Sequence, residues 1–93
     1  MQDGNLYTIT YSHTAIKDIT KLKSAHLDTK ARELINILRE NPFKSPPAFE
    51  KLSGDLKGAF SRRINSKHRM VYQVFEDERT VKIISLWTHY ERL

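Results

Sequence analysis

Residues 61–72 read SRRINSKHRMVY, and this stretch decides the fold because it holds two strand-like runs on either side of a short polar turn. The runs extend outward to give strands over Ala59 to Ile64 and over His68 to Phe75. Only Asn65-Ser66-Lys67 separates them, and so short a turn joins neighbouring antiparallel strands. The stretch therefore predicts a hairpin that is rich in cations: Arg62, Arg63, Lys67 and Arg69, with His68 beside them.

One further strand is expected at each end of the chain. Leu6 to Tyr11 alternates polar with apolar residues and is rich in β-branched and aromatic types. Thr80 to Trp87 follows the polar turn Glu76 to Glu78 and is apolar at both sets of alternate positions. A strand that is apolar on both faces is expected in the centre of a sheet, and its alternation does not decide which face meets the core.

Between the first strand and the hairpin, apolar residues recur at helical spacing in two runs. Ser12 is placed to cap the first run, because a serine hydroxyl accepts from an orphan amide of the first turn. Asn41 to Ala48 holds all three prolines and is expected to be a loop. Residues 49–56 give no clear pattern. The apolar positions are Ala15, Ile16, Ile19 and Leu22 in the first run, and Leu27, Ala31, Leu34, Ile35 and Leu38 in the second.

These elements predict one α+β domain over residues 1–93, with two N-terminal helices packed on one face of a mainly antiparallel four-stranded sheet. Strand alternation places Met70, Tyr72 and Val74 on the face toward the helices. Arg69 falls on the other face, which no element is expected to cover. There it would be available to a ligand.

Composition narrows the partner and the compartment. Sixteen Lys and Arg against eleven Asp and Glu give a net charge of +5, which favours nucleic acid, an acidic protein or a membrane surface. A basic surface that is simply solvated is the alternative. The chain has no cysteine, which excludes disulfides, thiolate zinc sites and cysteine nucleophiles and fits a reducing cytoplasm. No apolar run approaches the roughly 20 residues of a membrane span.

The residues present suit cleavage of RNA without a metal. That reaction needs a base for the 2′-hydroxyl, a cation for the phosphorane and an acid for the leaving 5′-oxygen. Arginine supplies a permanent charge whose fork matches two phosphate oxygens, and histidine titrates near pH 6.5. The chain has no zinc-binding spacing, glycine-rich phosphate loop or Ser-His-Asp arrangement, and we expect no cofactor.

The residues alone leave alternatives open at each candidate. His89 can be catalytic or merely terminal, whereas His68 is expected to be a hydrogen-bonded support. Glu50 follows the proline-rich loop and can be a base or a surface residue. Tyr90 is a candidate for stacking on a base. The cations of the hairpin and its neighbours can bind phosphate or be solvated: Lys57, Arg62, Arg63, Lys67 and Arg69.

Two motifs together resemble the Txe/YoeB toxins of the RelE/ParE superfamily. The hairpin residues 60–64 and 68–72 are similar to the family's core pattern, and His89-Tyr90 is similar to its terminal His-Tyr pair. Glu50 falls at the family's catalytic glutamate when the stretch before Ser61 is aligned without gaps. The resemblance covers nearly the whole chain and implies a RelE-like fold.

The resemblance also implies roles for single residues. Glu50 would be the general base, Arg69 would stabilise the phosphorane, and His89 would be the general acid. Tyr90 would orient or stack on the substrate. The remaining cations would hold phosphate, with Lys51 or Lys57 replacing the basic residue that relatives often have where this chain has Ser53. These cations are Lys51, Lys57, Arg62, Arg63 and Lys67. A second departure is the three-residue extension, Glu91 to Leu93, after the His-Tyr pair.

Members of this family are ribosome-dependent endoribonucleases that cut mRNA in the ribosomal A site, so the resemblance implies mRNA and the ribosome as partners. It also implies a cognate YefM/Axe-like antitoxin with a disordered acidic segment that folds over the toxin. The sequence does not decide between a monomer and a homodimer. Two rivals stay open: a non-catalytic relative that binds an acidic partner, and a plain basic RNA-binding module.

Overall fold

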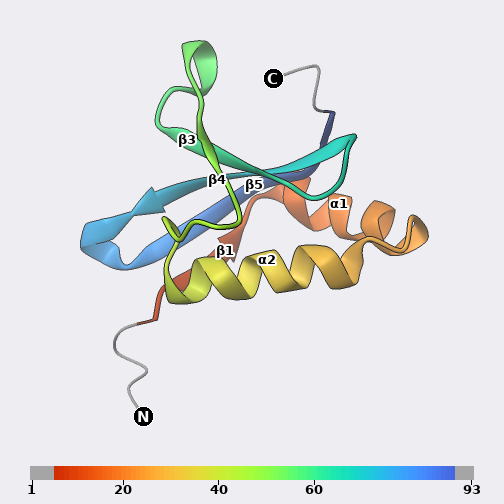
Figure 1. The fold of residues 1–93 in the computed structure, drawn as a ribbon, viewed down its shortest axis with the longest axis horizontal. Coiled ribbons are helices and arrows are strands. Elements are labelled where there is room, and N and C mark those ends of the chain that lie inside the picture. Colours follow the sequence, from red (N-terminus) through yellow and green to blue (C-terminus); the bar gives the residue numbers. More distant parts are fainter. Residues whose placement is uncertain (1–5, 90–93) are drawn as a thin grey trace.

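The computed structural model describes residues 6–89, with side chains described as far as Trp87. Two α-helices and five strands make up this part of the chain (Figure 1). Short 3-10 turns lie at Gly54–Leu56 and Glu76–Glu78. The order is β1 (Thr8–Tyr11), α1 (His13–Ser24), α2 (Asp28–Glu40), β2 (Glu50–Lys51), β3 (Ala59–Arg63), β4 (His68–Phe75) and β5 (Thr80–His89).

The strands form one sheet in the order β1-β5-β4-β3-β2. β1 runs parallel to β5, and the other pairs are antiparallel, so the predicted α+β class and the hairpin are confirmed. The predicted count of four strands is wrong by one, because β2 adds a fifth at the edge. With only two residues, Glu50 and Lys51, β2 is too short to produce the alternation by which strands are recognised in sequence.

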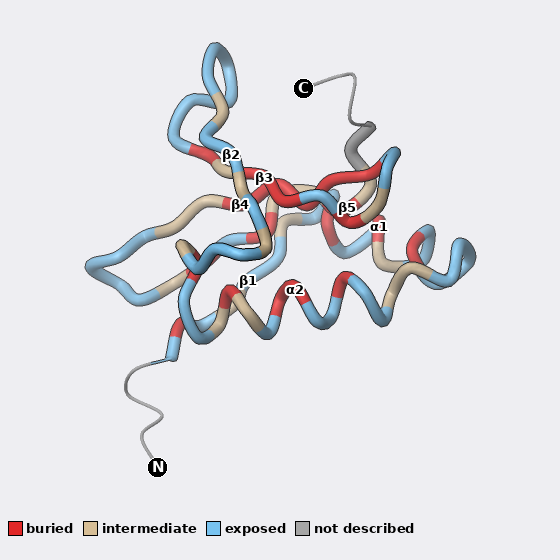
Figure 2. Tube along the Cα trace, in the orientation of Figure 1, coloured by how far each residue is buried: buried red, intermediate tan, exposed pale blue. Residues whose placement is uncertain are grey.

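Both helices lie on one face of the sheet, and the buried positions of α2 point toward it (Figure 2). The interior strand β5 presents Val81 and Ile83 to the helices, and the central strand β4 presents Met70 and Tyr72, all fully buried. Strand alternation therefore predicted the core face of β4 correctly. The helices complete the core with buried apolar side chains: Ala15, Leu22, Ala31, Leu34, Ile35 and Leu38.

The apolar stripe predicted for α1 is wrong at one position. Ile16 is 56% exposed, whereas Asp18 is buried at 4% exposure. Asp18 is buried because its carboxylate accepts a hydrogen bond of 2.9 Å from the backbone N–H of Leu86 in β5. Asp18 lies at helical spacing from the buried Ala15 and Leu22 and so shares their face of α1. The Leu86 N–H requires a partner, which explains why a carboxylate occupies this buried position.

The α1 contacts fall where β5 departs from regular pairing. Tyr72 pairs with Ile83 but Val71 pairs with Ser85, so Ile84 is an extra residue and forms a β-bulge. Ser12 caps α1 as predicted, accepting from the N–H of Ala15 at 3.0 Å, and its hydroxyl also donates to the Ile84 carbonyl at 2.7 Å. Side chains at the start of α1 thus satisfy backbone groups at the bulge.

Residues 41–49 form the loop that the prolines predicted, and it packs on the sheet beside the helices. Phe43 and Phe49 from the loop contact Phe60 of β3, with ring centroids 5.5 and 5.9 Å apart respectively. Phe60 in turn lies 5.8 Å from Tyr72 of β4. This aromatic cluster extends the core toward β2, which directly follows the loop.

In the part of the chain that the structure describes, neither helix is long and apolar enough to cross a bilayer.

Candidate active site

An ion pair between β2 and β4 forms the centre of the candidate site. Nη2 of Arg69 lies 2.9 Å from Oε1 of Glu50. The arginine side chain is only 3% exposed, whereas that of the glutamate is 58% exposed. The expectation that Arg69 stands on an uncovered face is therefore wrong, because its side chain is almost fully buried and is bonded to Glu50. The prediction that Glu50 and Arg69 meet at one site is consistent with this geometry.

Ser61 of β3 orients the same arginine. Its hydroxyl accepts a hydrogen bond of 2.9 Å from Nε of Arg69, and the serine is fully buried. Glu50 pairs with Ser61, and Ser61 pairs with Val71, so three adjacent strands bring these side chains to the same place. Sequence reasoning gave Ser61 no role. The signal was available, since Ser61 and Arg63 alternate on one strand and share the face of Arg69.

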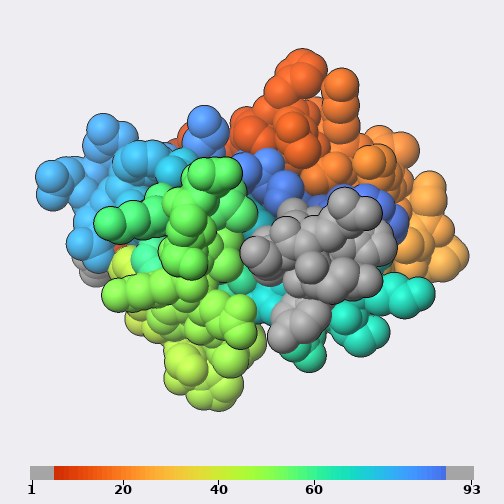
Figure 3. Space-filling view, turned by 90° about the horizontal axis from the view of Figure 1, so that it is seen from above, coloured from red at the N-terminus to blue at the C-terminus, as the bar shows by residue number. Residues whose placement is uncertain are grey.

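A cleft of about 280 Å³ opens beside this ion pair and is lined by Pro47, Ala48, Glu50, Arg63 and Arg69. Arg63 is exposed and pairs across the hairpin with Arg69. Seen from above, the segment from the proline-rich loop to β3 forms a raised part of the surface, coloured yellow-green to green (Figure 3). The cleft therefore combines two guanidinium groups and one carboxylate in a space large enough for a phosphodiester.

Arg62 does not belong to this cleft, and its predicted contact with RNA is wrong. The side chain has no exposed surface. It donates hydrogen bonds to the carbonyl oxygens of Pro42 and Pro47 and to the hydroxyl of Tyr72. Adjacent residues of a strand point to opposite faces, so Arg62 enters the aromatic cluster while Arg63 faces the cleft. A buried guanidinium that is bonded in this way cannot reach a phosphate.

The predicted lysines are distributed over two places. Lys67 is exposed in the turn between β3 and β4, on the same hairpin as Arg63 and Arg69. Lys51 and Lys57 line a separate hollow of about 560 Å³ with Phe60 and its neighbours. Lys51 pairs with Phe60 of β3, whose ring belongs to the aromatic cluster. The Lys51 side chain therefore lies on the opposite face of β2 from the Glu50 side chain. Of the three predicted lysines, only Lys67 therefore lies on the hairpin that carries Arg63 and Arg69.

The histidine and tyrosine at the end of the chain are only partly covered. His89 is the last residue of β5, and its backbone pairs with His68, the residue before Arg69. Its side chain and the whole of Tyr90 lie outside the described residues, as does the extension Glu91 to Leu93. Backbone pairing thus brings the end of β5 next to the strand that carries Arg69. The predicted roles of the His89 and Tyr90 side chains stay predictions.

A family model described as the YoeB-like toxin of bacterial type II toxin–antitoxin systems matches residues 11–90. The chain belongs to this toxin family. Toxin YoeB of Synechocystis sp. is 42% identical over 59 residues, which are 63% of this chain and 66% of that protein, just under two thirds of its length. The predicted membership of the YoeB group is therefore confirmed.

Two solved structures from Staphylococcus aureus show that this YoeB-like chain also shares the family's fold. The YoeB–YefM complex has a TM-score of 0.74 at 34% identity, with 90% of this chain and 98% of that chain covered. The YoeB dimer has a TM-score of 0.76 at 33% identity and the same coverage. The RelE-like architecture expected from the sequence is thus confirmed.

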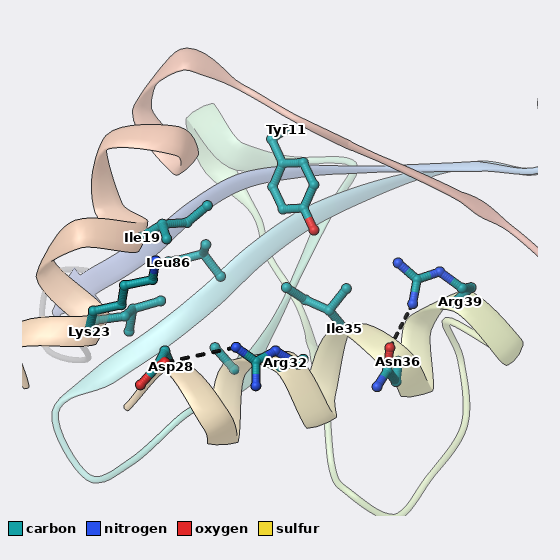
Figure 4. A pocket seen from close by; sticks show the side chains of 11 residues that line it. Tyr11, Ile19, Lys23, Asp28, Arg32, Ile35, Asn36, Arg39 and Leu86 are labelled. Carbon is teal, nitrogen blue, oxygen red and sulfur yellow. Dashed lines mark hydrogen bonds and ion pairs between the residues drawn. The ribbon is translucent and has the colours of Figure 1, made fainter. Parts of the chain in front are cut away.

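Two further features of this YoeB-like chain flank the site or lie apart from it. His68 is buried and stacks on Trp87 of β5, with ring centroids 3.9 Å apart, so it supports the strand that ends in His89. The support comes from this ring stacking, and the expected hydrogen bond stays a prediction. A groove of about 310 Å³ lies between α1 and α2 (Figure 4). None of the residues that line the cleft lines this groove. Among the described residues, no cluster of acidic or histidine side chains is placed to hold a metal ion.

Proposed function

We propose that this YoeB-like toxin is a ribosome-dependent endoribonuclease that cleaves mRNA in the ribosomal A site and so inhibits translation. The observation that carries the proposal is the buried Arg69 guanidinium, held by Glu50 and Ser61 at the wall of a cleft that also contains Arg63. A guanidinium whose orientation is fixed before the substrate arrives stabilises charge that develops on a phosphate, because it needs no reorganisation during the reaction.

In the proposed reaction, Glu50 removes the proton from a 2′-hydroxyl. The oxygen attacks the adjacent phosphorus, and Arg69 stabilises the pentacoordinate phosphorane. His89 then protonates the departing 5′-oxygen, which leaves one product with a 2′,3′-cyclic phosphate and one with a 5′-hydroxyl. Arg63 and Lys67 hold the phosphate backbone, and Tyr90 stacks on or orients a base. Arginine provides the positive charge, so the reaction needs no metal ion.

The ribosome has a specific part in this proposal. Among the residues that the structure describes, Glu50 is the one carboxylate that lines the cleft, and it is paired with Arg69, so the RNA must be aligned before Glu50 can act on a 2′-hydroxyl. Fixing the geometry of reacting groups is worth about 7–11 kcal/mol in favourable cases. We propose that the ribosomal A site provides this alignment and that the toxin therefore acts in the cytoplasm.

We also propose a cognate antitoxin of the YefM type as the second partner, by analogy with the S. aureus YoeB, which forms a complex with YefM. The groove between α1 and α2 suits an acidic amphipathic segment. Its floor includes Ile19, Ile35 and Leu86, and Lys23 and Arg32 stand along its sides (Figure 4). The net charge of +5 favours the same partner. Self-association, as in the S. aureus YoeB dimer, is the further assembly to test.

The test of the proposed function is expression in cells, followed by primer extension on cellular mRNA. Expression of the wild-type toxin is expected to stop growth and to produce mRNA cuts that fall within codons of translated regions. Glu50→Gln, Arg69→Lys and His89→Gln are each expected to bring the cuts below detection in cells while the variants remain folded. Lys82→Gln, an exposed change on β5, is the matched control. If all three folded site variants still cut mRNA, the mechanism is wrong.

A non-catalytic antitoxin-binding relative is the alternative function, and the existing ion pair favours it in one respect. Arg69 is already neutralised by Glu50 before any RNA arrives. Under this alternative, purified toxin binds antitoxin tightly but never cleaves mRNA on programmed ribosomes. Replacing His89 then changes nothing.

A further inference from the structure

We infer that Arg62 is a positioning residue, which ties the proline-rich loop to the sheet from behind the cleft and thereby places Glu50 against Arg69. Its kinetic consequence rests on the proposed nuclease function. Its structural consequence does not, because the separation of Glu50 from Arg69 can be measured without any substrate.

Arg62 makes three hydrogen bonds with the three nitrogens of its guanidinium. Nη1 donates to the Pro47 carbonyl at 2.6 Å, Nη2 to the Pro42 carbonyl at 3.0 Å, and Nε to the Tyr72 hydroxyl at 3.1 Å. The Tyr72 hydroxyl in turn donates to the Pro42 carbonyl at 3.2 Å. One side chain thus joins both ends of the loop to the two strands of the hairpin.

The loop residues held by Arg62 are next to the cleft. Pro47 and Ala48 line the cleft together with Glu50. Phe49, the residue before Glu50, lies under the Arg62 guanidinium, with 4.9 Å between Cζ and the ring centroid. Arg62 therefore contacts the chain at Pro47, shortly before the carboxylate, and again at the residue that directly precedes it.

Little else in the sheet fixes the position of Glu50. β2 has only two residues and lies at the edge of the sheet, where it pairs with β3 alone. The Glu50 side chain is 58% exposed, so it is not confined by packing. An edge strand of this length has few ladder hydrogen bonds, and the loop that precedes it must be held by other contacts. Arg62, together with Tyr72, supplies such polar contacts between that loop and the sheet.

Only arginine suits this position. Within the described residues no carboxylate pairs with Arg62, so its buried charge is compensated by two carbonyls, a phenol and an aromatic face. Burying such a charge is unfavourable unless hydrogen bonds compensate it, and here each of the three guanidinium nitrogens makes one. Lysine keeps the charge, but its single nitrogen cannot reach the carbonyls of both Pro42 and Pro47 while also bonding Tyr72.

The kinetic experiment compares cleavage of mRNA on programmed ribosomes by the wild type and by Arg62→Lys. A misplacement of about 1 Å costs on the order of 100-fold in rate, so we expect kcat to fall by about 10- to 100-fold. KM should change less than about twofold, because the exposed cations that meet RNA are untouched. Lys30→Arg on α2, at an exposed position that lines neither the cleft nor the groove between the helices, is the control and should change neither constant.

A double-mutant cycle separates positioning from a general loss of structure. If Arg62 acts through Glu50, Arg62→Lys should have no further effect on the residual rate of Glu50→Gln. If the two changes instead multiply, Arg62 affects the reaction by another route and the inference is overturned. If the wild-type toxin cleaves no ribosome-bound mRNA, the proposed function is refuted. The inference about Arg62 is then tested by the structural experiment alone, which needs no substrate.

The structural experiment follows the Arg69 side chain by NMR without RNA or ribosome. In the wild type, the Nε–H of Arg69 bonds to Ser61 and the Glu50 carboxylate lies against Nη2, so these guanidinium protons should exchange slowly with water. In Arg62→Lys, the Nη2 protons should exchange at least about tenfold faster, whereas amide protons of β4 and β5 should stay protected. Equal exchange in both proteins, with the Glu50–Arg69 separation unchanged, would overturn the inference.

Discussion

Glu50 of β2 and Arg69 of β4 meet across β3 at 2.9 Å, yet the glutamate side chain is more than half exposed and the arginine side chain is almost fully buried. The pair is therefore asymmetric. The Ser61 hydroxyl accepts from Nε of the arginine and fixes its orientation, whereas more than half of the glutamate side chain is exposed at the cleft. In the proposed reaction, Arg69 is the fixed electrostatic group and Glu50 is the base for the 2′-hydroxyl.

Ser61→Ala is expected to lower the rate of mRNA cleavage about tenfold. The change removes the acceptor for Nε of Arg69 and leaves a buried, charged donor unpaired, which costs about 1–3 kcal/mol. Steady-state cleavage on programmed ribosomes and urea denaturation measure the two effects. Ser53→Ala, at an exposed position before the 3-10 turn, is the matched control. A Ser61→Ala protein with wild-type cleavage would show that Arg69 does not depend on this hydroxyl.

Tyr72 predicts how stability depends on alkaline pH. Burial raises the pKa of the Tyr72 hydroxyl above 10, and the nearby Arg62 charge and hydrogen bond oppose that rise only in part. Between the unfolded and folded pKa values, the unfolded chain has lost the proton that the folded protein keeps, so the free energy of unfolding falls as pH rises. This contribution is complete below about pH 10 and is lost above it.

Urea denaturation of the wild type and Tyr72→Phe at about pH 8, 10 and 11 checks this prediction. The wild type should lose more stability than the variant over the interval from about pH 10 to 11, since phenylalanine does not ionise. Below about pH 9 the difference between the two proteins should not depend on pH. Parallel loss of stability in both proteins through the whole range would mean that Tyr72 does not ionise differently on folding.

Asp18 is expected to be a major contributor to stability although it is a charged residue on a helix. Asp18→Ala removes the acceptor for the buried Leu86 N–H and should lower the free energy of unfolding by about 2 kcal/mol. Asp18→Asn keeps an acceptor of the same shape and should cost less than about 1 kcal/mol. Chemical denaturation of the two variants decides the matter, and equal losses would rule out the hydrogen bond as the cause.

The groove between the helices is expected to bind the antitoxin without taking part in cleavage. Reversing two charges along it, Lys23→Glu with Arg32→Glu, should weaken binding of purified cognate antitoxin at least about tenfold in calorimetry. Cleavage on ribosomes should be unchanged, because the cleft has different lining residues. Lys82→Glu on β5 provides the control for a change in net charge. Unaltered antitoxin affinity in the groove variant would place the partner elsewhere.

Local pattern predicted those elements whose partners are close in sequence. β4 matches its expected range, His68–Phe75, and β3 ends one residue before the expected Ile64. Alternation also placed Met70 and Tyr72 in the core. The misses depend on tertiary contacts. Asp18 accepts from a backbone N–H of β5, and β2 pairs with β3 over only two residues. Neither contact is visible in the segment that makes it.

The candidate site was predictable in its main residues but not in the division of labour among its arginines. The resemblance to known toxins indicated Glu50 and Arg69, and the structure brings them into contact. Counting cations treated Arg62 and Arg63 as equivalent, whereas alternation along β3 sends them to opposite faces. The buried carbonyls that hold Arg62 come from residues 15 and 20 positions earlier, so its structural role depended on how the proline-rich loop folds back.

The most direct measurement uses ribosomes programmed with a defined A-site codon in which single nucleotides carry 2′-deoxyribose. Transesterification requires the 2′-hydroxyl next to the scissile phosphate. Wild-type toxin should therefore cut the all-ribose message to give a 2′,3′-cyclic phosphate end, and one deoxy substitution at the cleaved nucleotide should abolish that cut. Undiminished cleavage of the deoxy-substituted message, or a product with no cyclic phosphate, would contradict the proposed reaction.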